Sequence, residues 1–200
     1  MNLPNKITVV RLILIPIFML FAFPLPVWFP WNGFFNTPTA GIIALVIYVF
    51  ASITDSIDGH IARKYNLVTN FGKFLDPIAD KLLVMAAMLS LIPRNLLYLW
   101  AAMIILAREF IVTGVRLVSA GEGVVIAAGK GGKLKMVLQT IALITLLTAG
   151  LFEGTKGGLE LTGTVLQVIG DVTLILAVIM TLISGAEYVK NSWGLLKKDM

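Results

Sequence analysis

Six long apolar runs constrain the fold of this 200-residue chain more than any other feature of its sequence. Hydrophobic residues make up 58% of the chain and charged residues only 14%, and a soluble domain of this size cannot bury so much apolar surface. A helix needs about 20 residues to cross a bilayer, which is close to the length of each run. We therefore expect an all-α, polytopic membrane protein with six transmembrane helices in a single domain over residues 1–200. The expected helices are 7–23, 39–60, 73–93, 95–119, 132–151 and 163–189.

The Lys and Arg residues gather on alternate connections between these runs. Both ends of the chain and the connections after the second and fourth runs are basic, whereas 24–38 has no basic residue and the other two connections have only Arg94 and Lys156. Because basic loops stay on the cytoplasmic side, we expect a multi-pass protein of the cell (inner) membrane with both termini in the cytoplasm. The net charge of +5 suits anionic lipid headgroups, and the scattered basic residues do not indicate nucleic-acid binding. The chain has no cysteine, which excludes thiolate chemistry.

Four of the six aspartates lie within the second and third runs. An aspartate near the middle of a membrane helix costs about 2.5–3.5 kcal/mol, so a group of four needs compensation. Asp55 and Asp58 are three residues apart and Asp76 and Asp80 four apart, so each pair lies on one helix face. If the two helices pack antiparallel, the four carboxylates converge, and they repel one another unless cations intervene. Oxygen ligands without His or Cys favour Mg²⁺, Mn²⁺ or Ca²⁺ over zinc.

Small and basic residues accompany these aspartates. Gly59 and Ala62 continue the face of Asp58 and leave a groove for a ligand, although small residues in membranes also serve close helix packing. Arg63 and Lys73 lie at the edge of this groove, where they suit phosphate oxygens. The whole string, D-x2-D-G-x2-A-R-x8-G-x3-D-x3-D from residue 55 to residue 80, resembles the signature of the CDP-alcohol phosphatidyltransferases at every fixed position.

This resemblance implies a six-span homodimeric enzyme in which an alcohol attacks a CDP-activated lipid, CDP-diacylglycerol, and CMP leaves. It implies Asp55, Asp58 and Asp76 as ligands of two Mg²⁺ or Mn²⁺ ions, and Asp80 as the general base, which can also bind a metal. The opening segment resembles the family's first helix, where Asn5 and Thr8 lie beside the nucleotide; helix capping is the alternative role for them. The residues expected to bind the CDP-lipid are Asn5, Thr8, Gly59, Ala62, Arg63, Gly72 and Lys73.

A second basic group indicates the acceptor alcohol. Arg108 and Arg116 lie on one broad side of the fourth run, and Lys133 and Lys135 begin the fifth. Together they could bind the phosphate of a phosphorylated acceptor, or they could anchor helix ends at the cytoplasmic surface. The pattern R-E-F-x5-R followed by G-K-x-K-x3-Q resembles the phosphatidylglycerophosphate synthase branch of the family, whose acceptor is glycerol 3-phosphate. That branch usually has Thr where this chain has Met136.

Two other functions remain open from the sequence. The phosphatidylinositol-phosphate branch of the family also takes a phosphorylated acceptor, so it is the nearest alternative. A different class, an intramembrane cation transporter, also uses intramembrane carboxylates. A transporter would carry them at mid-membrane on broken helices, whereas here they lie at the ends of the runs beside basic residues.

Overall fold

The computed structural model describes residues 2–64, 70–121 and 130–196. In these ranges the chain forms seven α-helices and one short 3-10 helix, and no strand. The elements are α1 (Leu3–Ala22), α2 (Asn32–Phe35), α3 (Pro38–Lys64), α4 (Asn70–Leu91), α5 (Leu99–Gly121), α6 (Lys130–Ala149), η1 (Gly150–Phe152) and α7 (Gly158–Leu196). The expected all-α fold is confirmed over this part of the chain.

Each predicted apolar run corresponds to one of the six long helices. The short helix α2, between α1 and α3, was not expected, because four residues leave no periodic pattern. Helix α7 has 39 residues and is much longer than the predicted 163–189. At 1.5 Å per residue it is about 58 Å long, about twice the thickness of a bilayer's hydrocarbon core. The polar residues after 189 hid this extension, since hydropathy identifies the membrane-spanning part of a helix and not its end.

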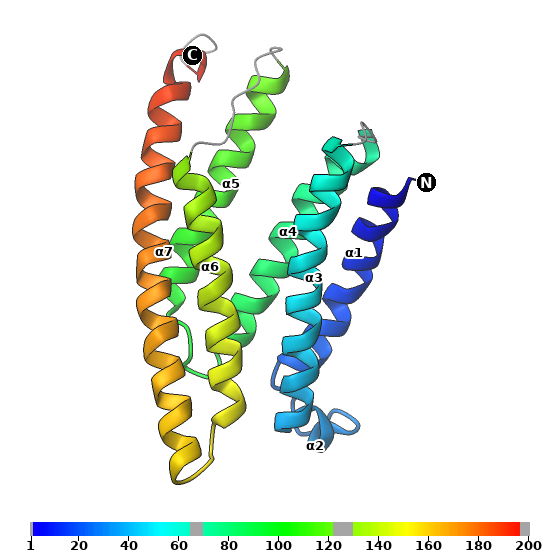
Figure 1. The fold of residues 1–200 in the computed structure, drawn as a ribbon, viewed down its shortest axis with the longest axis vertical. Helices are drawn as coiled ribbons and strands as arrows, with labels where there is room; N and C mark the ends of the chain where they lie inside the picture. Colours follow the sequence, from blue (N-terminus) through cyan, green and yellow to red (C-terminus); the bar gives the residue numbers. More distant parts are fainter. Residues whose placement is uncertain (1, 65–69, 122–129, 197–200) are drawn as a thin grey trace.

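The long helices form two groups, and successive helices run in opposite directions along the bundle (Figure 1). Helix α1 packs against α3 and α4, and α7 packs against α6 and α5, while α6 also contacts α3 and α4. The beginning of α1 and the end of α7 lie at the same end of the bundle, together with the end of α3, the beginning of α4 and the beginning of α6 (Figure 1). The helix ends that border the basic segments of the sequence therefore lie at one end of the bundle, which we call the polar end. Helix α2 lies at the opposite end.

The bundle packs through small residues and close helix contacts. Ala40, Ala87 and Ala142 are fully buried, and Gly170 of α7 packs closely against Leu146 of α6. A Cβ atom on Gly170 would lie only 2.5 Å from Leu146 Cδ2. Small residues let helix backbones approach in membrane proteins, where van der Waals contact drives packing.

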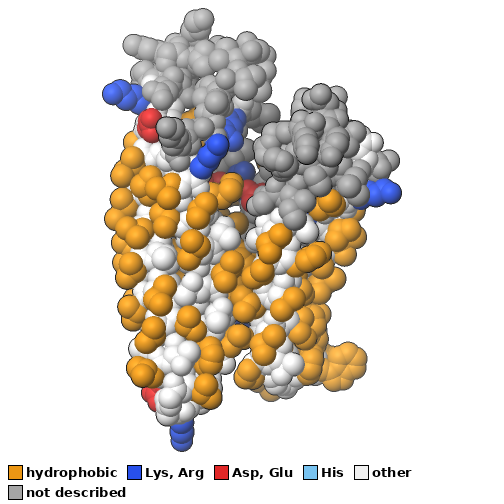
Figure 2. Space-filling model, viewed as in Figure 1, with side chains coloured by type: hydrophobic (Ala, Val, Ile, Leu, Met, Phe, Trp, Pro, Cys, Tyr) orange, Lys and Arg blue, Asp and Glu red, His pale blue; other side chains and the backbone are white. Residues whose placement is uncertain are grey.

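The outer surface of the bundle is apolar over most of its length (Figure 2). Three helices in the described ranges are long and apolar enough to cross a membrane, over Asn5–Ala22, Gly131–Phe152 and Gly158–Lys190. Helix α3 has a shorter apolar segment, Pro38–Thr54, and α4 and α5 carry several charged residues, so the count of six spans stays a prediction. The apolar helices indicate an integral membrane protein.

Candidate active site

The acidic motif lies where α3 ends and α4 begins, at the polar end of the bundle. The backbone of residues 55–63 belongs to the last turns of α3, as expected, but the side chains of Asp55, Asp58, Ala62 and Arg63 lie outside the described residues, as does that of Lys73 in α4. The convergence of all four carboxylates therefore stays a prediction. Gly59 is helical, and Gly72 is buried in the first turn of α4.

Helix α1 presents a buried polar face to α4. Asn5, Thr8 and Arg11 follow one another at intervals of three residues and are 7%, 1% and 1% exposed. Thr8 Oγ1 donates a hydrogen bond of 2.5 Å to Asp76 Oδ1. Helix α1 starts at Leu3 with Asn2 as its N-cap, so Asn5 lies in the first turn of the helix and is not its N-cap. The hydrogen bond between Thr8 and Asp76 joins a residue predicted to bind the CDP-lipid to a predicted metal ligand.

A cavity of about 450 Å³ lies beside this face and is lined by all six long helices. Its wall contains Asp80 and the four cations predicted for the acceptor: Arg108, Arg116, Lys133 and Lys135. The structure thus brings together residues that are up to 55 positions apart in the chain (80 and 135). Figure 2 shows charged side chains in the hollow between the two helix groups, near the polar end.

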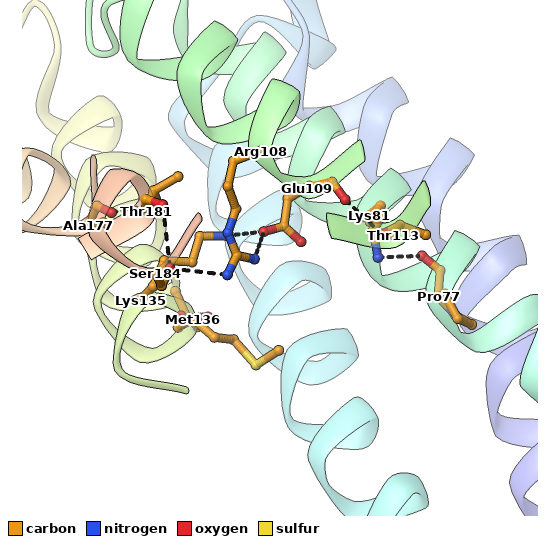
Figure 3. A network of polar contacts seen from close by, with 11 residues as sticks. Pro77, Lys81, Arg108, Glu109, Thr113, Lys135, Met136, Ala177, Thr181 and Ser184 are labelled. Atoms are coloured by element: carbon orange, nitrogen blue, oxygen red, sulfur yellow. Dashed lines mark hydrogen bonds and ion pairs between the residues drawn. The ribbon is translucent and has the colours of Figure 1, made fainter. Parts of the chain in front are cut away.

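An ion-paired network fixes part of this wall (Figure 3). Glu109 Oε1 accepts a bond of 2.6 Å from Lys135 Nζ and one of 3.1 Å from Arg108 Nη1. Arg108 Nη2 also donates to Ser184 Oγ at 3.1 Å. The Lys135 side chain is only 5% exposed and that of Glu109 18%. A buried cation needs such a partner, because an unpaired charge away from water is very unfavourable.

Helix α7 holds both arginines of α5 in place. The guanidinium carbon of Arg116 lies 5.7 Å from the centre of the Tyr188 ring, a cation–π contact. Arg108 passes so close to Gly185 that a Cβ atom there would lie 3.1 Å from Arg108 Cγ. The two arginines are therefore positioned by a helix in which the sequence predicted no site residue.

Several lining residues were missed by the sequence analysis. Arg11 was not predicted as a site residue, although its spacing of three from Thr8 extends the face of Asn5 and Thr8. On α7, polar side chains recur every three or four residues within an apolar run, and this spacing could have indicated that they share one face of the helix. Glu109 and Gln139 entered the sequence analysis only as fixed positions of the acceptor pattern, with no role of their own. The lining residues with polar side chains that were missed altogether are Arg11, Tyr48, Ser52, Lys81, Thr113, Thr140, Ser184, Glu187 and Tyr188.

The charged side chains that line the cavity favour the binding of an anionic ligand close to a carboxylate. Six Lys and Arg residues and three Asp and Glu residues line it, so its field attracts a negatively charged ligand. Glu109 neutralises part of the charge of Arg108 and Lys135, while Lys133 and Arg116 have exposed side chains. Asp80 lies in the same wall. The site can therefore hold a phosphorylated molecule beside a group that accepts protons.

Comparison of the sequence with known proteins shows the family of this membrane protein. The family model for CDP-alcohol phosphatidyltransferase matches residues 1–183, and the chain belongs to this family. The chain is 46% identical to CDP-diacylglycerol–glycerol-3-phosphate 3-phosphatidyltransferase of Bacillus subtilis (strain 168), over 98% of this chain and 97% of that protein. The enzyme of the same name from Rickettsia bellii is 39% identical, over 94% of each chain. A probable phosphatidylglycerophosphate synthase of Mycobacterium tuberculosis (strain ATCC 25618 / H37Rv) is 38% identical, over 96% of this chain and 81% of its own.

Proposed function

We propose that this protein transfers the phosphatidyl group of CDP-diacylglycerol to glycerol 3-phosphate and releases CMP. The names of its near full-length relatives support this activity. The observation that carries it in the structure is the cavity in which Asp80 and the four predicted acceptor cations share one wall. Acceptors without a phosphate would not need so many cations.

The reaction needs three events at neighbouring atoms. A hydroxyl oxygen of the acceptor forms a bond to the lipid-side phosphorus of CDP-diacylglycerol, and the bond from that phosphorus to the oxygen of CMP breaks. The hydroxyl proton passes to the Asp80 carboxylate, which we assign as the general base. A base in hydrogen-bond reach of a reacting hydroxyl typically accelerates such a step by about 10²–10⁴-fold.

The carboxylates of the signature fit divalent cations by their chemistry. Asp76 and Asp80 are partly exposed on adjacent turns of α4, and Thr8 restrains Asp76 through its hydrogen bond. With Asp55 and Asp58 they form a set of hard oxygen donors suited to two Mg²⁺ or Mn²⁺ ions. When bound, such ions neutralise the charge of a pyrophosphate and of the leaving group.

The remaining predicted residues divide between the two substrates. We assign Asn5, Thr8, Gly59, Ala62, Arg63, Gly72 and Lys73 to CDP-diacylglycerol, since Asn5 and Thr8 are buried against the end of α4 that carries Asp76. We assign Arg108, Arg116, Lys133 and Lys135 to the phosphate of the acceptor. Met136 also lines the cavity, so the change from the usual Thr removes one hydroxyl from its wall.

The proposed placement of the protein in the membrane follows from the positive residues at the polar end of the bundle. We propose a homodimer in the cell (inner) membrane with six spans and the polar end in the cytoplasm, where soluble glycerol 3-phosphate is available. Positive residues at that end support this orientation. The lipid tails then enter between helices from the bilayer, and the two substrates meet at the headgroup level.

The test is an assay of CMP release. Purified protein receives CDP-diacylglycerol with Mg²⁺ or Mn²⁺, and glycerol 3-phosphate, inositol phosphate or serine is added in turn. We expect turnover with glycerol 3-phosphate and none after chelation of the metal. A preference for inositol phosphate would place the protein in the neighbouring branch. Absence of CMP release with every acceptor, together with cation flux into protein-loaded liposomes, would favour a transporter.

Two variants separate the halves of the proposed site. Asp76→Ala should abolish CMP release with any acceptor, because it removes a predicted metal ligand. Lys135→Ala should mainly raise the KM for glycerol 3-phosphate and leave that for CDP-diacylglycerol unchanged. Equal effects of both variants on both substrates would contradict the division.

A further inference from the structure

The side chain of Gln139 is buried in the wall of the cavity, and no described residue donates a hydrogen bond to its oxygen. Gln139 belongs to α6, is 4% exposed and lines the cavity. Its Oε1 atom accepts no hydrogen bond from any described residue. Buried polar atoms in proteins are nearly always paired. A buried amide that lines an open cavity and lacks a partner therefore indicates that a ligand supplies one.

The kind of ligand follows from the chemistry of the unpaired atoms. An amide oxygen only accepts hydrogen bonds, so it cannot bind the oxygens of an ionised phosphate, which also only accept. It needs a donor such as a hydroxyl. In the same wall, Arg108 Nε is a buried donor without an acceptor among the described residues. The pair of atoms matches one molecule that carries both an anionic oxygen and a hydroxyl.

The spacing on α6 gives this molecule a direction. Lys135 and Gln139 are four residues apart on one face of the helix, separated by a rise of about 6 Å. A phosphate near Lys135 and Arg108 therefore leaves the carbon chain of a short phosphate ester free to extend toward Gln139. The hydroxyl of the neighbouring Thr140 already donates to Met136 O at 3.0 Å, so Gln139 is better placed to serve the ligand.

We propose that Gln139 binds the acceptor hydroxyl that does not react, and thereby selects polyol phosphates over phosphate esters with a single hydroxyl. This inference rests on the proposed function, in which one hydroxyl of glycerol 3-phosphate attacks phosphorus and the 2-hydroxyl remains. Gln139 is then a specificity-determining residue of the acceptor site. A site built to bond a hydroxyl discriminates strongly against the analogue that lacks it, because its own polar group is left unpaired.

The experiment compares two acceptors in two proteins. The acceptors are glycerol 3-phosphate and 3-hydroxypropyl phosphate, which keeps the phosphate and the attacking hydroxyl but lacks the 2-hydroxyl. We expect the wild type to prefer glycerol 3-phosphate by about ten- to a hundredfold in kcat/KM, the usual cost of leaving a buried polar group unpaired. In Gln139→Leu the preference should fall to about threefold or less, chiefly through loss of glycerol 3-phosphate activity.

Gln167→Leu is the matched control, since it makes the same change on α7 at a described residue outside the cavity, and it should keep the wild-type preference. Gln139→Met, a side chain of similar length without hydrogen-bonding groups, carries the same prediction if the leucine variant does not accumulate. An equal loss with both acceptors in the Gln139 variants would overturn the inference, as would a wild type that uses both acceptors equally well. A wild type inactive with glycerol 3-phosphate would instead overturn the proposed function.

Discussion

Among the described residues, the hydroxyl of Thr8 joins the first helix to the acidic motif through its bond to Asp76 Oδ1. We expect Thr8→Val to lower kcat/KM for CMP release by about ten- to a hundredfold, because a hydrogen bond to a charged group contributes about 1.5–3 kcal/mol. The variant keeps the shape of the side chain, so the loss of stability measured by thermal unfolding in detergent should not exceed about 3 kcal/mol, the contribution of this single bond. Thr8→Ser, which keeps the hydroxyl, is the control and should retain most of the activity. Equal activity of Thr8→Val and wild type would show that this bond does not position Asp76.

Glu109 is the counterion that makes a buried Lys135 tolerable. We expect Glu109→Gln to destabilise the protein by about 3 kcal/mol, because removal of one partner leaves a buried cation uncompensated. Thermal unfolding in detergent measures this loss, and added glycerol 3-phosphate should restore more stability to the variant than to the wild type, since the phosphate then replaces the lost charge.

The control for Glu109 is Glu153, whose ion pair with Arg94 is 3.8 Å long and whose side chain is 45% exposed. Exposed pairs contribute about 0–1 kcal/mol, so Glu153→Gln should leave the unfolding temperature nearly unchanged. If the two variants lose equal stability, the burial of the Lys135 pair has no energetic consequence.

Among the elements, α7 supports the two arginines of α5 that we propose to bind the acceptor. We expect Gly185→Ala to raise the KM for glycerol 3-phosphate by about threefold, because a Cβ atom 3.1 Å from Arg108 Cγ displaces the guanidinium, and small misplacements weaken binding and catalysis. The KM for CDP-diacylglycerol should stay constant. Gly114→Ala is the control, since no atom lies within 4 Å of a Cβ at that position. A change in both KM values would indicate a general distortion of the bundle.

The helices also show which features of the fold and of the site can be predicted from the sequence and which cannot. Apolar runs located all six long helices, because burial in lipid demands continuous hydrophobicity, and the four cations predicted for the acceptor line one cavity, as their spacing along α5 and α6 suggested. The roles of Glu109, Ser184 and Tyr188 were not predicted. Glu109 of α5 pairs with a lysine of α6, and Ser184 and Tyr188 of α7 contact arginines of α5. These contacts depend on how α5, α6 and α7 pack, and packing between distant segments leaves no periodic signal in the sequence.

For the whole molecule, the lack of cysteine allows a direct test of its orientation in the membrane. Lys156 and Lys190 are exposed at opposite ends of α7, near the two ends of the bundle. We expect a membrane-impermeant maleimide to label Lys156→Cys in intact cells and Lys190→Cys only after the membrane is opened, because in the proposed orientation the positive end of the bundle faces the cytoplasm. The cysteine-free wild type is the control. Labelling of Lys190→Cys in intact cells would reverse the proposed orientation.

The cavity draws residues from every long helix, from Arg11 near the start of the chain to Tyr188 near its end. During synthesis this chamber is therefore incomplete until the last helix enters the bilayer. A nascent or prematurely terminated chain that stops before Gly158 lacks the residues that hold Arg108 and Arg116 in place. It can occupy the membrane but lacks the side of the cavity that α7 supplies, so a cell gains the proposed activity only from polypeptides in which α7 has been translated.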